Sequence, residues 1–164
     1  MPTATRKNRH AVQQQSNPAQ LLDNQLCFSL YSASLAMTKL YKPLLEALDL
    51  TYPQYLVMLV LWERDDLSVS MLGERLSLDS GTLTPLLKRM ETAGLLKRQR
   101  SSEDERRVHV CLSDAGRQLQ TQAAHIPGCL VARSGLPLDD LVALNQQLKT
   151  LRAALQAPLP SSTI

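Results

Sequence analysis

Three cysteines, at positions 27, 111 and 129, are the residues of this 164-residue chain with the most distinctive chemistry. Their spacing matches no metal-ligand pattern, and three thiols are too few for a disulfide scaffold, so at least one is a candidate reactive thiol. Three of the four tyrosines follow Cys27 in the next segment: Tyr31, Tyr41 and Tyr52. A lone cysteine is more often a small core residue, but phenol hydroxyls that donate to a thiolate lower its pKa and favour its oxidation.

Geometry limits how Tyr41 can serve Cys27. The two residues are fourteen positions apart. On one straight helix they share a face but lie about 21 Å apart along the axis. A contact between them therefore has to cross a two-fold dimer interface, which supplies the same pair twice.

The elements that must position these residues are mostly helical. From Asp23, which can act as a cap, apolar residues recur at spacings of three and four, and Pro43 is expected to kink or end this helix near Lys42. A second helix over 54–63 is apolar nearly all round and belongs in the core. Thr51 and Gln54 have the spacing of a capping box at its start.

Two short helices and a hairpin follow the core helix. Ser70 can cap a helix that ends at Leu76, and Asp79 can cap a helix over 80–93, with Gly94 just past its end. Two short helices joined by a tight turn form a helix-turn-helix. Residues 95–100 and 107–112 alternate as strands do, and they flank a charged tip. The chain is thus predicted to be mainly α with a small β-wing, a winged helix-turn-helix.

The remaining chain is predicted to form two closing helices. Ser113 can cap a helix that runs to about Ala124, Pro127-Gly128 interrupts it, and a last helix covers 138–155. No apolar run is long enough to span a bilayer, and the start lacks the apolar core of a signal peptide. We therefore expect a cytoplasmic protein that has no membrane contact.

Basic residues gather in the second short helix and the hairpin. Between positions 88 and 107 there are seven basic and four acidic side chains, and this excess of three equals the net charge of +3 of the whole chain. A solvated hairpin would also be charged, but a basic cluster directly after a capped two-helix turn favours DNA binding. The side chains expected to contact DNA are Ser80, Thr82, Thr84, Lys88, Arg89, Arg98, Arg106 and Arg107.

The helix pair and the hairpin also carry a specific set of motifs. Residues 79–91 read DSGTLTPLLKRME, followed by Gly94-Leu95, by DERR at 104–107 and by LSDAG at 112–116. Over about residues 24 to 156 these motifs resemble the MarR family of regulators. The resemblance implies that Asp104 fixes the wing and that Arg106 points to DNA. It also implies an obligate homodimer with intertwined first and last helices, bound to a pseudopalindromic double-stranded operator.

This resemblance divides the chain into an arm, one domain and a tail. Residues 1–22 are expected to be a disordered basic arm and 158–164 a frayed tail. Residues 23–157 are expected to form a single MarR-type domain. Its dimerisation helices cover 23–50 and 114–156, and its winged helix-turn-helix covers 51–113.

Within that family, the spacing of Cys27, Tyr41 and Tyr52 is similar to that of the organic-hydroperoxide-sensing repressors (OhrR). This implies that Cys27 accepts hydrogen bonds from the two tyrosines of the other subunit. It also implies that an alkyl or lipid hydroperoxide, which acts as the inducer, oxidises Cys27 to a sulfenic acid. In one branch of that group a small thiol caps the sulfenate, and in the other a partner cysteine closes a disulfide. We favour the two-cysteine branch, with Cys129 as the resolving thiol because it follows Pro127-Gly128, over Cys111 on a strand.

Two other functions are compatible with part of the sequence. One is a MarR-type repressor that a small lipophilic or phenolic ligand releases from DNA, with Cys27 as core filler. The other is a thiol peroxidase that uses Cys27 and Cys129, which leaves the basic helix-turn-helix and wing without a role. The three histidines have no nucleophile placed beside them in the sequence, so we expect no enzyme, no metal and no cofactor.

Overall fold

The computed structural model describes residues 17–100 and 107–157. The chain separates into two units, residues 1–38 and 39–164. The first unit holds two short 3-10 turns, η1 (Pro18–Gln20) and η2 (Leu22–Asn24), and the start of helix α1 (Leu26–Glu46). The expected cap Asp23 lies inside η2, so α1 begins three residues later than predicted. Of the predicted basic arm, residues 1–16 lie outside the described part of the chain.

Helix α1 does not end at Lys42. Of the two predicted outcomes, a kink or an end, the end does not occur, because the helix continues through Pro43 to Glu46. Proline removes a single backbone donor. The side chains of Tyr41 and Leu45 flank Pro43 and are buried in the core, and their packing favours the last turn in spite of the missing hydrogen bond.

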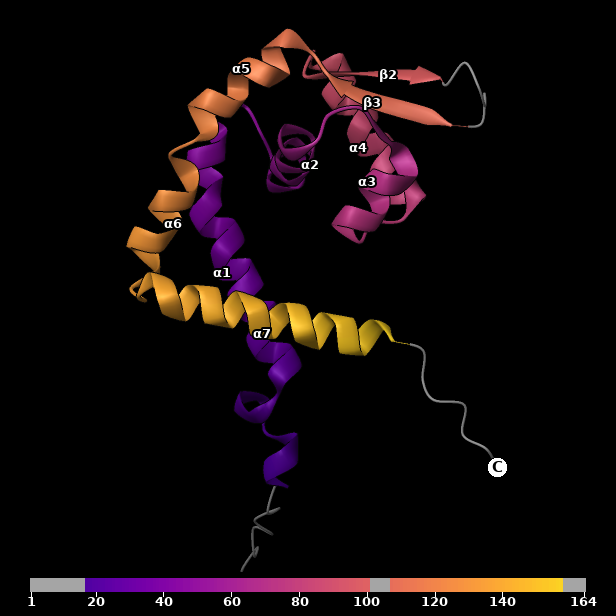
Figure 1. Ribbon diagram of the computed structural model, residues 1–164. Coiled ribbons are helices and arrows are strands. Elements are labelled where there is room, and N and C mark those ends of the chain that lie inside the picture. Colours follow the sequence, from indigo (N-terminus) through magenta and orange to yellow (C-terminus); the bar gives the residue numbers. More distant parts are fainter. Residues whose placement is uncertain (1–16, 101–106, 158–164) are drawn as a thin grey trace, which may run out of the picture. The chain divides into compact units, whose positions relative to one another are not determined.

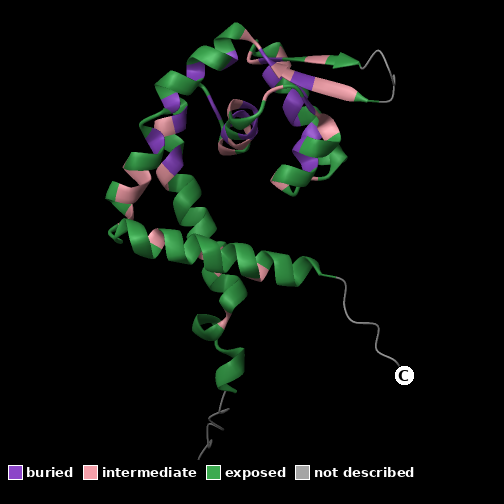
Figure 2. Cartoon of the chain, viewed as in Figure 1, coloured by how far each residue is buried: buried purple, intermediate pink, exposed green. Residues whose placement is uncertain are grey.

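Helix α2 (Tyr52–Glu63) forms the centre of the second unit, as its all-round apolarity predicts. Val57, Met58 and Leu61 are almost completely buried. At its start, the Thr51 backbone N–H donates to Gln54 Oε1 at 2.7 Å, which is the expected link between these two residues. Figure 2 shows buried segments on α2 and on the helices beside it.

The helix-turn-helix consists of α3 (Val69–Leu76) and α4 (Ser80–Thr92). Ser68 caps α3 through the Met71 N–H (3.2 Å), so the predicted cap Ser70 was wrong by two residues. Asp79 caps α4 as predicted, with Thr82 N–H donating to its Oδ1 at 2.9 Å.

The wing strands β2 (Leu96–Arg100) and β3 (Val108–Leu112) lie side by side and antiparallel, with Leu96 opposite Leu112 (Figure 1). A further strand, β1 (Leu67–Ser68), pairs with the other edge of β3, so the sheet has the order β1-β3-β2. The predicted two-stranded wing is therefore a three-stranded sheet. Strand β1 has only two residues, which are too few to show the alternation of apolar and polar side chains that marks a strand in a sequence.

Three helices close the chain where two were predicted: α5 (Asp114–Ala123), α6 (Ile126–Ser134) and α7 (Leu138–Gln156). Ser113 caps α5 as predicted, through the Gly116 N–H. Pro127 does not simply interrupt a helix, because it occupies the first turn of α6, where a missing donor costs nothing. None of the helices in the described part of the chain combines the length and apolarity needed to cross a membrane.

Candidate DNA interface and thiol site

Helix α4 turns an apolar face to the core and a polar face to solvent. Leu83, Leu87 and Met90 are buried on the first face. The five residues of α4 that are expected to contact DNA are exposed on the second face: Ser80, Thr82, Thr84, Lys88 and Arg89. The Thr82 hydroxyl also donates to Asp79 Oδ2 at 2.9 Å. Thr82 therefore helps to cap the helix as well as facing outward.

Arg98 does not project freely from the wing. Its backbone N–H and its Nε both donate to the Glu91 carboxylate, each at 2.8 Å. These contacts, led by the backbone N–H, hold the pKa of Glu91 below its usual range. The pair ties β2 to the end of α4. Glu91 was not among the predicted site residues, because nothing in its spacing from Arg98 marks it as a partner.

A cavity of about 260 Å³ lies between α3, α4 and the wing. Arg98, the exposed Arg107 and three hydroxyl side chains contribute to its lining: Ser68, Ser70 and Thr84. Guanidinium and hydroxyl donors in such an arrangement can bind an anionic oxygen such as that of a phosphate. The wing residues Asp104 and Arg106 lie outside the described residues.

Two of the tyrosines singled out in the sequence are brought together. The rings of Tyr41 and Tyr52 have centroids 5.0 Å apart, and Tyr55 packs 5.9 Å from Tyr41. Burial raises the pKa of Tyr41 to about 12 and also raises that of Tyr52. Both phenols are therefore protonated at neutral pH and keep an O–H to donate.

All three cysteines fall within the described residues and are free thiols. Cys27 is exposed on α1 in the first unit, whereas Cys129 on α6 and Cys111 on β3 are half-buried in the second. Cys129 lies inside helix α6, which already includes Pro127 and Gly128. The rings of Tyr41 and Tyr52 therefore pack against each other within the second unit, whereas Cys27 belongs to the first unit.

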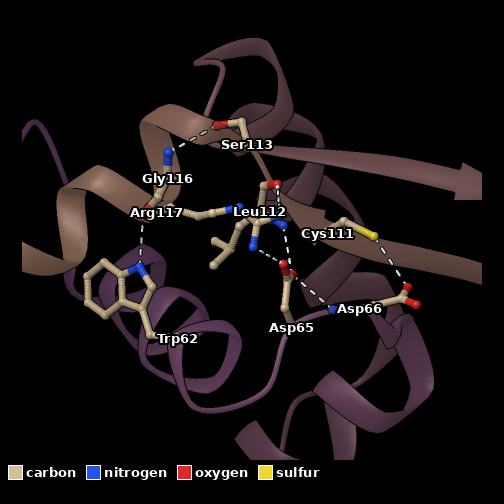
Figure 3. A network of polar contacts seen from close by, with 8 residues as sticks. All are labelled: Trp62, Asp65, Asp66, Cys111, Leu112, Ser113, Gly116 and Arg117. Atoms are coloured by element: carbon tan, nitrogen blue, oxygen red, sulfur yellow. Dashed lines mark hydrogen bonds and ion pairs between the residues drawn. The ribbon is translucent and has the colours of Figure 1, made fainter.

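A polar network that was not predicted from the sequence lies at the end of α2. Asp65 Oδ1 accepts the Leu112 N–H at 2.8 Å, and its Oδ2 accepts from Arg117 at 2.5 Å (Figure 3). Trp62 Nε1 donates to the Gly116 carbonyl at 2.9 Å. The network joins α2 to β3 and to the start of α5. Its partners are about fifty residues apart in the chain, and no local pattern marks them.

Comparisons with known proteins agree with this architecture. A family model described as the transcriptional regulator SarA/Rot matches residues 39–122. The organic hydroperoxide resistance transcriptional regulator of Bacillus subtilis (strain 168) is 54% identical over 130 residues, 79% of this chain and 88% of that protein.

Solved structures of AbfR from Staphylococcus epidermidis are also similar. Reduced AbfR bound to DNA has a TM-score of 0.69 and 37% identity, covering 82% of this chain and 93% of that chain. Disulfide-formed AbfR has a TM-score of 0.56 and 39% identity, covering 79% and 91%.

The fold and the exposed basic helix define a winged-helix transcriptional regulator, as the sequence predicts. The chain belongs to the MarR family of transcriptional regulators, as its match to the SarA/Rot family model and its identity to the organic hydroperoxide resistance regulator show. The proteins it resembles are regulators of transcription and not enzymes.

Proposed function

We propose that this regulator is a cytoplasmic homodimeric repressor that holds a pseudopalindromic operator until an organic hydroperoxide oxidises Cys27. The observation that carries the proposal is the 54% identity to an organic hydroperoxide resistance regulator, in a chain whose sequence contains Cys27, Tyr41 and Tyr52. The solved structures of AbfR support it, because that protein exists in a reduced DNA-bound form and a disulfide form.

Dimerisation is supported by large apolar side chains on α7 and on the first part of α1 that are exposed in the described part of the chain. Helix α7 lies wholly in the described residues and buries none of its side chains (Figure 2). Large apolar side chains exposed on it are Leu138, Val142, Leu144, Leu148 and Leu155. Exposed apolar side chains on the first part of α1 are Leu26, Phe28, Tyr31, Leu35 and Met37. A second copy that covers these faces would remove them from water.

The proposed chemistry begins when the Cys27 thiolate attacks the outer oxygen of the hydroperoxide. The O–O bond breaks, the alkoxide takes a proton and leaves as the alcohol, and Cys27 becomes a sulfenic acid. The O–H groups of Tyr41 and Tyr52 from the partner subunit stabilise the thiolate. The Cys129 thiol then loses its proton, and its thiolate attacks the Cys27 sulfur; the S–OH bond breaks, the hydroxide takes a proton and leaves as water, and a disulfide forms. This bond shifts the DNA-reading units and releases the operator.

Arg89 offers a test of DNA binding by α4. Arg89→Ala should weaken binding by about 1 kcal/mol and lower the slope of log affinity against log salt by about 1, because one phosphate contact is lost. The measurement is fluorescence anisotropy with a duplex that the reduced protein selects from a random-sequence pool. Arg106→Ala should act in the same way. Arg133→Ala, which removes an exposed arginine of α6, is the matched control. An equal loss in the control would exclude a specific role for α4.

The choice of resolving thiol is tested by non-reducing gel electrophoresis after treatment with cumene hydroperoxide. The parent protein and Cys111→Ser should both give a disulfide-linked dimer. Cys129→Ser should give none and should release the selected duplex slowly or not at all, because its sulfenic acid has no partner thiol. A dimer band that disappears in Cys111→Ser and persists in Cys129→Ser would assign the role to Cys111.

A further inference from the structure

The third cysteine has a specific partner on the outer face of the wing sheet. Cys111 Sγ donates a hydrogen bond to Asp66 Oδ1 at 3.3 Å, as Figure 3 shows. His109, two residues earlier on the same face of β3, places its Nδ1 3.0 Å from the same oxygen. The buried Val110 and Leu112 occupy the opposite face of the strand. Cys111 is thus directed to a carboxylate and away from the core.

The Asp66 carboxylate is held in place by its neighbours. Asp66 has left-handed backbone geometry (φ 57°), and its N–H donates to Asp65 Oδ1 at 2.9 Å. Asp65 is itself bound to Leu112 of β3 and to Arg117 of α5. Directly after Asp66, β1 pairs with β3. The loop between α2 and β1 is therefore fastened to the strand that carries Cys111.

The charges around Cys111 favour its neutral form. Burial, followed by the hydrogen bond and the charge of Asp66, raises the pKa of this thiol to about 11, with Asp65 adding to the effect and Arg117 opposing it. Lys97 lies opposite Cys111 on β2 and is exposed. The hydrogen bond from Cys111 and that from His109 hold the pKa of Asp66 below its usual range, so its carboxylate is ionised at neutral pH.

We propose that Asp66 is a specificity-determining residue of the redox response, which holds Cys111 as a hydrogen-bond donor and confines oxidation and disulfide formation to Cys27 and Cys129. The roles of Cys27 and Cys129 rest on the proposed function, whereas the protection of Cys111 does not. Attack on a peroxide oxygen or on another sulfur requires a thiolate. With its proton held towards Asp66, Cys111 enters neither reaction, and β3 is not cross-linked through the wrong sulfur.

The test is alkylation of the reduced full-length chain by iodoacetamide, followed site by site with mass spectrometry across a range of pH. Asp66→Asn keeps the side-chain shape and removes the charge. It should speed alkylation of Cys111 by about tenfold at about pH 8. When the pH is far below the pKa of a thiol, a fall of about one unit in that pKa raises the thiolate fraction about tenfold. Asp49→Asn is the matched control, since Asp49 is also exposed and left-handed (φ 53°).

An unchanged Cys111 rate in Asp66→Asn, or an equal rise in Asp49→Asn, would overturn the proposal. The parent protein supplies a second measurement that needs no variant. Cys111 and Cys129 are both half-buried, so a difference between their alkylation rates reports the contact of Cys111 with Asp66. Cys111 should be alkylated at least about tenfold more slowly than Cys129 at about pH 8 in the folded protein, and at the same rate as Cys129 in denaturant. Equal rates in the folded protein would also overturn it. No peroxide is used, so this result is independent of whether hydroperoxide is the inducer.

Discussion

Replacing Cys27 with serine should abolish the release of DNA by organic hydroperoxide. Serine keeps the size of the side chain but cannot form a sulfenic acid, so no amount of oxidant can start the proposed sequence. Affinity of the reduced protein for the selected duplex should stay within about twofold, and release should fail even at ~100-fold the peroxide that frees the parent. Fluorescence anisotropy of the labelled duplex during titration with cumene hydroperoxide measures both quantities.

Cys111→Ser is the matched control, because it removes a thiol that Asp66 is proposed to hold out of the chemistry. It should respond to peroxide as the parent does. Release that persists in Cys27→Ser would instead favour a repressor released by a small lipophilic ligand. An apolar groove of about 320 Å³, lined in part by Tyr55, Leu59 and Trp62, offers such a ligand a place. Catalytic consumption of peroxide with a dithiol reductant would favour a peroxidase.

The second large effect concerns Gly116 at the start of α5. A Cβ at this position would lie 2.1 Å from the Leu95 carbonyl oxygen and 3.2 Å from Leu112 Cδ2. The residue cannot move away, because its N–H donates to Ser113 Oγ and its carbonyl accepts from Trp62 Nε1. Gly116→Ala should therefore lower the free energy of unfolding by about 3 kcal/mol or more, the usual result of forcing atoms into closely packed structure.

Gly128→Ala is the control for that prediction. Gly128 lies in helix α6, and a Cβ there meets nothing within 4 Å. Alanine should be neutral or should stabilise the protein by up to about 1 kcal/mol, because it is the better helix former. Urea unfolding followed by circular dichroism gives both values. Equal free energies of unfolding for the two variants would contradict the close approach of Gly116 to the Leu95 carbonyl.

Much of the fold is predictable from local patterns, because it is determined by local physics. Asp79 caps α4, Ser113 caps α5, and the alternation over 107–112 is that of β3. The failures occurred where tertiary contacts outweigh local preference. Helix α1 runs through Pro43 because its neighbours are buried, and β1 exists only because β3 offers it an edge.

The sequence predicts which residues of the candidate site are exposed. It does not predict which side chains bind one another there. The position of Lys88 and Arg89 on the outer face of α4 follows from helical periodicity. The engagement of Arg98 by Glu91 and of Cys111 by Asp66 does not, since both depend on which strand lies beside which helix or loop. The partner of Cys27 is a property of the dimer, so it remains a prediction.

Peptide mapping of the protein during operator release tests the central claim most directly. Samples taken along a cumene hydroperoxide titration of the DNA-bound protein are alkylated, digested without reductant and analysed by mass spectrometry. A cross-linked pair of peptides containing Cys27 and Cys129 should grow in proportion to the released duplex, while Cys111 remains a free thiol. Complete release with Cys27 still alkylated as a free thiol would contradict the account.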